Sequence, residues 1–414
     1  MVANKKKIWL VNQYAMPPKY ESRLRTIKFA HYLTEMGYDV TIFSSSFMHN
    51  MNKNLIEDNS KYIQKEYGKL NFVHINTIGY KNNGFARFIS LFQFHFKLYF
   101  LRNKFTRPDV IVHTALPPFG NIIYFAARKL KAKYIAEVLD LWPESFVDLG
   151  VLNKRNPFIL LSYFAEKWLY QKADNIIFSM EGGKDYIVEK KWDKDNGGLI
   201  DLKKVYYINN GVDLNDFNNN KTQYKLEDSD LDNVAIKKII YIGSIRLANN
   251  LQELIKAAFI LKDYSDIKFL LYGDGEDREP LEIFCKENKL DNVIFKQKWI
   301  EPHYVPYVLS KSSVNILNYK SGSFGKYGGS QSKLFQYLAS GKPICSNLKM
   351  RYCLINKNNL GIAHEFNSDD DYAKALLSLI ELDQISLLEM FERSQIVVKN
   401  FDYKKLTEKL VNIF

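Results

Sequence analysis

The sequence predicts an α/β protein with two domains, each built on a parallel sheet flanked by helices. Short apolar runs of strand length alternate with amphipathic segments of helix length through most of the chain, a pattern typical of parallel sheets with crossover helices. The chain has 414 residues, which is enough for two hydrophobic cores of ordinary size. Hydrophobic residues make up 46% of it and charged residues 25%, the usual balance of a globular protein in water.

In the first half of the chain, apolar runs and helical patterns follow one another without a long break. Strands are expected at residues 8–11, 40–43, 71–77, 110–112, 134–138 and 175–179. Helices are expected at residues 22–35, 85–105, 120–130 and 157–171. Together these segments form the predicted first domain, residues 1–205.

The second half repeats this style without repeating the sequence. Strands are expected at residues 238–242, 268–272, 293–295 and 314–317, and helices at 251–261, 280–287 and 305–310. A polar stretch at residues 215–232 is the best candidate for a linker or surface loop, so the second domain is placed at 206–395. A C-terminal helix follows within residues 396–414. Its docking surface is left open, and packing on the first domain is one alternative.

The net charge of +12 is compatible with two interpretations. It can reflect solvated lysine-rich faces, or attraction to an anionic substrate, a lipid surface or a nucleic acid. The three cysteines have neither metal-ligand spacing nor the pattern of a disulfide framework. No apolar run approaches the roughly 20 residues of a membrane-spanning helix, and the first run is too short for a signal peptide. The sequence therefore predicts a cytoplasmic protein that binds no metal.

Residues 325–343, GKYGGSQSKLFQYLASGKP, are the most informative segment of the chain. A glycine-rich loop leads through Ser330, Ser332 and Lys333 into an apolar-periodic segment, which a glycine and a proline then end. The free N–H groups and the positive dipole end of a helix that starts here suit an anion, most often a phosphate. Lys333 can be a solvated first-turn lysine, but a cation beside that helix end is unfavourable unless an anion lies nearby.

Ligands of doubly wound sheets bind at the carboxyl ends of the strands, so residues just after strands are candidates. In the second half these residues are Gly243, Ser244 and Arg246 after one strand, and Gly273 and Gly275 after the next. Glycine allows a ligand to approach the backbone, and arginine can pair with phosphate through two N–H groups. The alternative is a pair of plain turns with a surface arginine.

In the first half, Tyr14, His113, Asp140 and Glu181 follow strands. His113 can donate a hydrogen bond or carry a proton, or it can be a satisfied structural histidine. Asp140 can contact a substrate or cap the next helix. In the second half, Trp299 ends the strand-like segment KQKW and can stack on a base or serve as a core or rim aromatic. Because both halves carry such turns, we expect a cleft between two facing domains.

The sequence lacks the motifs of several enzyme classes. The sequence has no Ser-His-Asp order, no HExxH, no CxxC and no Walker lysine motif. A GxGxxG fingerprint is also missing after the first strand. Hydrolase, zinc-enzyme and Walker-type NTPase interpretations therefore have no support.

The expected helix at residues 85–105 carries Arg87, Lys97, Arg102 and Lys104 among aromatic side chains, and no acid. A basic, aromatic, amphipathic helix is typical of a membrane-surface element. The alternative is an ordinary packing helix with a basic outer face. Nucleic acid could use the same surface, but no recognised nucleic-acid motif accompanies it.

Six segments carry, in chain order, a resemblance to a known family. They are VNQYAMPPKYESRLRTIKFAHYLTEMGYDVTIFSSSF, EVLDLWPESFVDLG, YINNGVDLNDF, YIGSIRLANNLQELIKAA, LYGDGEDREPLE and SQSKLFQYLASGKPI. With them the chain resembles retaining glycosyltransferases of family 4, which have the GT-B fold of two facing Rossmann-like domains. It is most similar to the bacterial branch that builds capsule and O-antigen polysaccharides.

The resemblance implies that the second domain binds the nucleoside diphosphate of a sugar donor. Arg246 and Lys333 would neutralise the pyrophosphate, and the helix starting near Ser332 would supply N–H groups. The other implied donor-binding positions are Gly243, Ser244, Gly273, Gly275, Trp299, Ser330 and Gln336.

The first domain would take the acceptor, with Tyr14, Arg25, Trp142 and Glu181 as the implied contacts. Arg25 matches an arginine of the family's first loop and helix. The expected catalytic residues are His113, Asp140, Arg246 and Lys333, of which Asp140 belongs, like Trp142, to the D-x-W-P turn.

The sequence departs from the family at two positions of the glycine-rich region. Two glutamates of the family, eight positions apart, fall on Gly328 and Gln336, and neither is a carboxylate. Gln336 can still hydrogen-bond ribose hydroxyls, although without charge.

The resemblance implies transfer of a hexosyl or N-acetylhexosaminyl group from a nucleotide-sugar, for which UDP is the expected nucleotide. The acceptor would be a saccharide or lipid-linked saccharide of surface polysaccharide biosynthesis, at the inner membrane face. No cofactor beyond the nucleotide-sugar is expected. The alternative is a non-catalytic GT-B relative that serves as a saccharide-binding or assembly subunit. Nucleic-acid binding is a third, less favoured interpretation.

Overall fold

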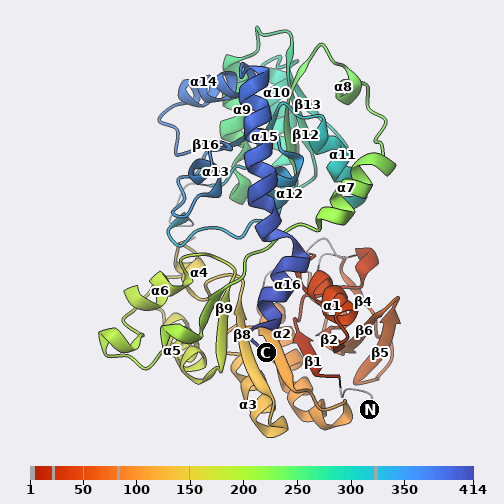
Figure 1. The fold of residues 1–414 in the computed structure, drawn as a ribbon, viewed down its shortest axis with the longest axis vertical. Coiled ribbons are helices and arrows are strands. Elements are labelled where there is room, and N and C mark those ends of the chain that lie inside the picture. Colours follow the sequence, from red (N-terminus) through yellow and green to blue (C-terminus); the bar gives the residue numbers. More distant parts are fainter. Residues whose placement is uncertain (1–4, 21–23, 50, 82–83, 149, 321–324) are drawn as a thin grey trace. The chain divides into compact units, whose positions relative to one another are not determined.

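The computed structural model describes residues 5–20, 24–49, 51–81, 84–148, 150–320 and 325–414. The chain divides into two compact units (Figure 1). Met1–Asn209 and Tyr403–Phe414 form the first unit, and Asn210–Asp402 forms the second. The last helix of the chain is therefore part of the first unit.

The first unit is built on a sheet whose described strands follow the order β10-β9-β8-β7-β1-β2-β6-β5. Neighbouring strands are parallel except β5, which pairs antiparallel with β6. The strands are β1 (Lys7–Val11), β2 (Asp39–Ser45), β5 (Tyr62–Tyr67), β6 (Leu70–Ile75), β7 (Val110–Thr114), β8 (Lys133–Val138), β9 (Asn175–Phe178) and β10 (Val205–Tyr207). A separate short antiparallel pair is formed by β3 (Phe47–Met48) and β4 (Lys53–Asn54). The central strands are buried on both faces, as helix-covered parallel sheets require.

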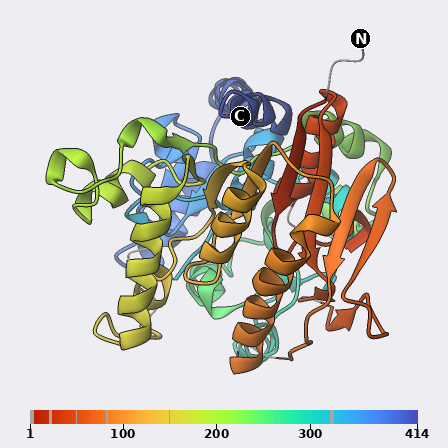
Figure 2. The same cartoon turned by 90° about the horizontal axis from the view of Figure 1, so that it is seen from below.

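Helices cover both faces of this sheet (Figure 2). On one face lie α2 (Phe85–Leu101), α3 (Asn121–Leu130) and α5 (Pro157–Lys172), with α3 in contact with the other two. On the other face α1 (Arg25–Glu35) packs against α16 (Tyr403–Val411), where the rings of Phe29 and Tyr403 meet edge to face at 5.9 Å. The shorter helices α4 (Glu144–Asp148) and α6 (Gly183–Glu189) follow β8 and β9.

The second unit has an entirely parallel sheet in its described part, in the order β13-β12-β11-β14-β15-β16. The strands are β11 (Lys237–Ile242), β12 (Ile267–Tyr272), β13 (Val293–Phe295), β14 (Val314–Ile316), β15 (Ile344–Ser346) and β16 (Gly361–Ala363). The helices are α7 (Leu214–Gln223), α8 (Ser229–Asp232), α9 (Leu251–Ile260), α10 (Arg278–Glu287), α11 (Val305–Ser310), α12 (Ser332–Ser340), α13 (Leu354–Lys357), α14 (Asp369–Ile380) and α15 (Gln384–Val398). The predicted alternation of strands and helices, and with it the α/β class, is confirmed in both units.

The polar stretch at residues 215–232 is not the linker or surface loop that we predicted, because it forms most of α7 and α8. Asp213 and Asp228 cap these helices by accepting hydrogen bonds from backbone N–H groups of the first turns. Lys296 then ties α8 to the sheet through ion pairs with Asp228 at 2.7 Å and with Asp230 at 2.5 Å. Polar side chains thus start and anchor helices here.

Two further expectations concern membranes and cysteines. Among the described residues, none of the helices combines the length and the apolar character that crossing a bilayer requires. The three cysteines are buried and unpaired. The part of the chain that the structure describes also holds no cluster of three or more potential metal ligands.

Candidate functional site

Two glycine turns meet at the carboxyl ends of adjacent strands in the second unit. Gly243 follows β11 with a φ of +146°, and Gly273 follows β12 with a φ of +129°. A Cβ on Gly273 would lie 1.9 Å from the carbonyl oxygen of Gly243, so the turns pack backbone against backbone. The predicted positions Gly243, Ser244, Gly273 and Gly275 are therefore gathered at one edge of the sheet.

Lys333, the second residue of α12, reaches the same edge. Its Nζ lies 2.8 Å from the hydroxyl oxygen of Tyr241 and 4.4 Å from the centroid of the Tyr241 ring. A Cβ on Gly243 would lie 2.3 Å from Cε of Lys333, so the glycine leaves the space that the lysine side chain fills. The structure thus joins two segments that the sequence analysis singled out separately.

The surroundings of Lys333 disfavour its positive charge. Burial of the amine lowers the pKa of Lys333 from 10.5 to about 7. Desolvation causes this shift, and no ion pair joins Lys333 to a carboxylate within the described residues. An anion bound beside the amine would supply the missing countercharge and favour the ammonium form.

The start of α12 is also free of negative side chains. Gln331 at the N-cap makes no side-chain hydrogen bond to the helix, and the first turn contains no acid. Ser332 is exposed and Gln336 is half-buried. The carbonyl of Ser330 accepts a hydrogen bond of 2.5 Å from Nδ2 of Asn210, which holds the preceding loop. The dipole end of this helix is therefore open to an anionic group.

Arg246 and Trp299 lie exposed on two other loops of the second unit. Arg246 comes three residues after Gly243. Trp299 is 67% exposed, which leaves its ring available for stacking. The prediction that Trp299 ends a strand is wrong, because β13 stops at Phe295 and the next side chain, Lys296, turns to the aspartates of α8.

Arg25, a predicted acceptor contact, is only 4% exposed and is engaged by the protein itself. Its Nε donates to Oε1 of Glu137 at 2.9 Å. Its two terminal nitrogens donate to the carbonyls of Asn209 at 2.5 Å and Ile208 at 2.8 Å. Because each guanidinium nitrogen has a protein partner, the geometry favours a role in tying α1 to β8 and to the end of β10.

His113, an expected catalytic residue, lies inside the first unit. Its Nδ1 is 2.8 Å from the hydroxyl of Tyr134, and its Nε2 is 3.3 Å from Nε2 of His95. Nδ1 of His95 lies 2.7 Å from the carbonyl of Leu91, which can only accept, so this nitrogen carries the hydrogen. His113 then donates to His95 and accepts from Tyr134. This chain of neutral groups favours the alternative of a satisfied structural histidine.

The other first-unit candidates keep some access to solvent. Asp140 is exposed and Trp142 is half-buried in the turn after β8, and Glu181 is half-buried after β9. Trp142 packs edge to face on a ring of α4 at 4.3 Å, and its buried Nε1 has no hydrogen-bond partner among the described residues. The hydroxyl of Tyr14 accepts a hydrogen bond from Nε of Arg87 at 3.0 Å.

Tyr241, a residue of the candidate site, and Glu137, the partner of Arg25, are two residues that the sequence did not single out. In the sequence, Tyr241 is one more apolar residue of a strand, and nothing indicates where its hydroxyl points. Glu137 did give a signal, since an acid inside the apolar run of β8 needs a buried partner.

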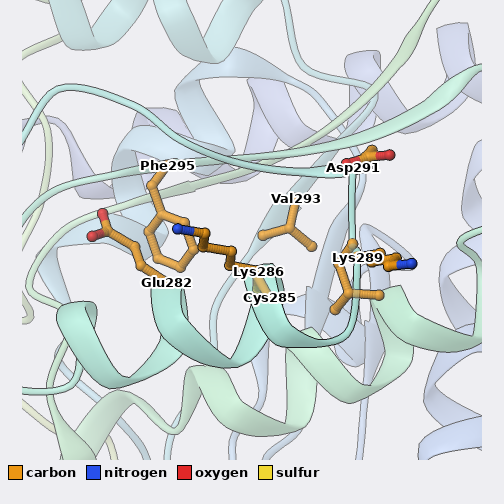
Figure 3. Close-up of a pocket in the computed structure, with 8 residues that line it drawn as sticks. Glu282, Cys285, Lys286, Lys289, Asp291, Val293 and Phe295 are labelled. Carbon is orange, nitrogen blue, oxygen red and sulfur yellow. The ribbon is translucent and has the colours of Figure 1, made fainter.

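Another part of the second unit carries a surface hollow (Figure 3). It measures about 520 Å³ and lies between α10 and the start of β13. Its lining mixes both charge signs and contains none of the predicted site residues: Glu282, Cys285, Lys286, Lys289, Leu290, Asp291, Val293 and Phe295. Because the predicted residues follow the ends of strands, this hollow is a separate surface feature.

Two family models match the chain, one on each half. The model of glycosyltransferase family 4 matches residues 25–216, and the model of glycosyl transferases group 1 matches residues 228–395. The second match contains both strand-end glycine turns and the whole of α12.

The chain is also similar to individual proteins. An uncharacterised glycosyltransferase of Methanocaldococcus jannaschii is 24% identical over 319 residues, covering 73% of this chain and 76% of the relative. Anabaena HepE, solved in complex with UDP and glucose, matches with a TM-score of 0.64 at 12% identity over 98% of both chains. WaaG, a glycosyltransferase involved in lipopolysaccharide biosynthesis, matches with a TM-score of 0.66 at 12% identity over 98% of this chain and 99% of WaaG. These structural likenesses establish the fold.

Gly243→Ala is expected to weaken the binding of an anion beside Lys333 about tenfold or more, because the new Cβ would displace the Lys333 side chain. Isothermal titration calorimetry with inorganic pyrophosphate as the probe measures the change. Gly197→Ala is the matched control, since Gly197 also has a positive φ, of +82°, but has no atom within 4 Å of its Cβ position. Equal affinity in the Gly243→Ala variant and the wild type would contradict the expectation.

Acid is expected to destabilise the first unit. Burial lowers the pKa of His74 and of His95 to about 4, and that of His113 well below 6.5. Between about pH 6.5 and 4 the unfolded chain therefore binds protons that the folded chain does not. Stability falls as the pH falls, by about 1.4 kcal/mol per pH unit for each histidine. Burial raises the pKa of Glu166 to about 8, so this carboxyl has the opposite effect on stability. It is a single group, whereas three histidines destabilise the folded chain in acid.

Urea unfolding at pH 7 and pH 5, followed by tryptophan fluorescence, measures this effect, since four of the five tryptophans are in the first unit. His74→Asn should reduce the pH dependence, and His31→Asn, at a solvent-accessible position, should leave it intact. A wild-type midpoint that stays constant or rises on acidification would rule out the expected uptake of protons.

Proposed function

We propose that this chain, a glycosyltransferase with the two-domain GT-B fold, transfers a hexosyl or N-acetylhexosaminyl group from a UDP-linked donor with retention of configuration. The observation that carries the proposal is the arrangement around Lys333. A desolvated amine, a glycine that makes room for it and a helix start without acids together favour a bound diphosphate.

The second unit holds the diphosphate of the donor in this proposal. Lys333, Arg246 and the N–H groups at the start of α12 take up the negative charge that develops as the sugar leaves. Lys333 and Arg246 would stabilise the leaving diphosphate as a bound metal ion does in other enzymes, so the proposed mechanism requires no side chains that bind a metal. The complex of the similar protein HepE with UDP supports a uridine nucleotide.

Retention requires that the acceptor attack from the face that the diphosphate leaves. The bond between the anomeric carbon and the phosphate oxygen breaks, and its electron pair stays on the phosphate. The acceptor oxygen bonds to the same carbon and releases its proton. The match of residues 25–216 to glycosyltransferase family 4 supports this outcome.

The proposed acceptor is a saccharide or lipid-linked saccharide of surface polysaccharide synthesis, reached at the inner membrane face. WaaG, which is involved in lipopolysaccharide biosynthesis, supports this class of acceptor. Exposed aromatic residues on α2 and α5 support the location. Phe85 and Phe100 on α2 expose 79% and 62% of their surface, and Phe164 on α5 exposes 68%.

Charge around these two helices also suits anionic lipid. The helices touch through the rings of Phe88 and Phe158, which meet at 5.7 Å. Residues 84–108 contain no acid, and the single acid of residues 151–172 is the buried Glu166. Exposed cations flank both helices: Lys104 after α2, and Lys154 and Arg155 before α5. Exposed aromatic side chains with cationic side chains beside them are typical of a surface that docks on anionic membranes.

A second candidate is a non-catalytic GT-B protein that binds saccharides or assembles with an enzyme. The observation that favours it is the absence of carboxylates at Gly328 and Gln336, where the family has glutamates. Mass spectrometry of UDP-sugars incubated with the protein separates the two functions. Release of UDP with a lipid-linked acceptor supports transfer, and donor binding without turnover across a broad acceptor panel supports the second candidate.

Lys333→Ala and Arg246→Ala should each lower kcat about 100-fold or more, because each removes a group that stabilises the leaving diphosphate. The assay is UDP release from the donor that the mass-spectrometric screen identifies. Lys320→Ala, which removes an exposed cation from the same unit, is the control and should retain wild-type turnover. Near wild-type rates in both site variants would defeat the proposed diphosphate site.

Flotation with vesicles that contain anionic lipid should carry the protein to the top of a gradient, and high salt should weaken it. Replacing Phe85 and Phe100 by Ser should reduce flotation, whereas Val234→Ser, at an even more exposed apolar residue of the second unit, should not.

The contribution of basic side chains to flotation is tested by a second pair of variants. Reversing Lys104 and Arg155 to Glu should reduce flotation, and reversing Lys286 and Lys289 in the second unit should leave it unchanged. Flotation that ignores salt and all four first-unit substitutions would exclude this membrane surface.

A further inference from the structure

Tyr241 lies inside the second unit with its hydroxyl between two groups of the candidate site. It belongs to β11, and none of its surface is exposed. Its hydroxyl donates to the carbonyl oxygen of Ser244 at 2.6 Å and lies 2.8 Å from Nζ of Lys333. Nothing in the family matches or in the proposed function assigns a role to this side chain.

The direction of these hydrogen bonds follows from simple counting. A tyrosine hydroxyl has one hydrogen, and the carbonyl of Ser244 can only accept it. The oxygen lone pairs of Tyr241 therefore face Lys333, and the amine must be the donor. A protonated amine then keeps two further N–H groups for a ligand.

Lys333 is restrained on more than one side. The Tyr241 hydroxyl fixes the end of the side chain, the Tyr241 ring lies beneath the amine at 4.4 Å, and the absent side chain of Gly243 defines its channel. The titratable groups recorded near Tyr241 are Tyr319 and Tyr337, and burial keeps both hydroxyls neutral.

We infer that Tyr241 is a positioning residue, whose hydroxyl orients the amine of Lys333 and favours its protonated form. The first part of this inference concerns the protein alone. The second, that the ammonium so held receives a nucleoside diphosphate, rests on the proposed function.

The physical basis is the difference between a charged and a neutral donor. A hydrogen bond from an ammonium group is stronger than one from a neutral amine, so an acceptor beside Lys333 stabilises the ammonium form. Burial alone opposes that form, and it lowers the pKa of Lys333 to about 7. Without the hydroxyl, we expect the amine to lose its proton at a pH lower by about 0.5 to 1 unit.

Tyr241→Phe tests the hydroxyl with little disturbance of the fold. The ring remains, and the carbonyl of Ser244 keeps a hydrogen bond of 2.8 Å from Nδ2 of Asn249. Tyr337→Phe is the matched control. Tyr337 is equally buried and lies on the same helix as Lys333, but its hydroxyl faces the backbone of Ile242 and makes no hydrogen bond to Lys333 among the described residues.

The first measurement uses the full chain without any ligand. The rate of acylation of Lys333 by acetic anhydride, followed by mass spectrometry across pH, gives the titration midpoint of the amine. We expect the same midpoint in the wild type and in Tyr337→Phe, above the value of about 7 that burial alone gives, and a lower midpoint in Tyr241→Phe. An unchanged midpoint in Tyr241→Phe, or an equal shift in Tyr337→Phe, overturns the inference.

The second measurement is calorimetric titration with UDP between pH 6 and 8.5. If binding requires the ammonium form, the affinity falls by up to about tenfold per pH unit above the midpoint of free Lys333. In Tyr241→Phe this fall should begin at lower pH, with a loss at pH 8 larger than at pH 6. A uniform loss at every pH would indicate a merely structural role. A wild type that binds no UDP would reject the proposed function, and the acylation result would still decide the role of Tyr241.

Discussion

Desolvation of one amine, on the half-buried side chain of Lys333 and without a carboxylate partner, is the constraint on which the second unit's candidate site depends. Lys333 lies against Tyr241 in a channel that exists because Gly243 has no side chain. A desolvated cation costs free energy unless an anion compensates it. The surroundings of Lys333 therefore favour the bound state of a strongly anionic group, which would supply the missing countercharge.

The glycines at this edge of the sheet are required by packing. The turns after β11 and β12 touch backbone to backbone, and a side chain on Gly273 would fall on the carbonyl of Gly243. The backbone of these two turns has little conformational freedom, because the turns are in close contact. A rigid pair of turns suits a site that must stabilise charge during a reaction, because preorganised groups need no rearrangement.

The first unit uses its buried polar groups in a different way. The guanidinium of Arg25 is divided among Glu137 and two carbonyls, and His113 is closed into a chain with His95 and Tyr134. These groups satisfy one another and hold the sheet to its helices. In the proposed function, contacts with an acceptor would therefore fall to more accessible residues such as Asp140 and to the exposed rings of α2 and α5, where apolar surface and positive charge occur together.

The sequence by itself determined the architecture and marked candidate residues. Alternating apolar periods predict strands and helices, and the glycine-rich entry to α12 marks Lys333, because both signals are carried by residues close together in the chain. The prediction of helices and strands failed where the apolar pattern of the sequence is weak. The polar residues 215–232 suggested a loop but form capped helices, and the edge strand β5 was missed because none of its residues is fully buried.

Tertiary structure decided which polar groups meet. Lys333 pairs with Tyr241, which is 92 positions away, and Arg25 pairs with Glu137, which is 112 positions away. Local periodicity tells that a residue is buried, but only the folded chain sets which distant side chain shares its space. For that reason Arg25 and His113 were candidate ligand-binding residues in the sequence, but in the structure both make hydrogen bonds inside the first unit. Tyr241 was predicted only as part of a strand, and the structure shows that it also contacts Lys333.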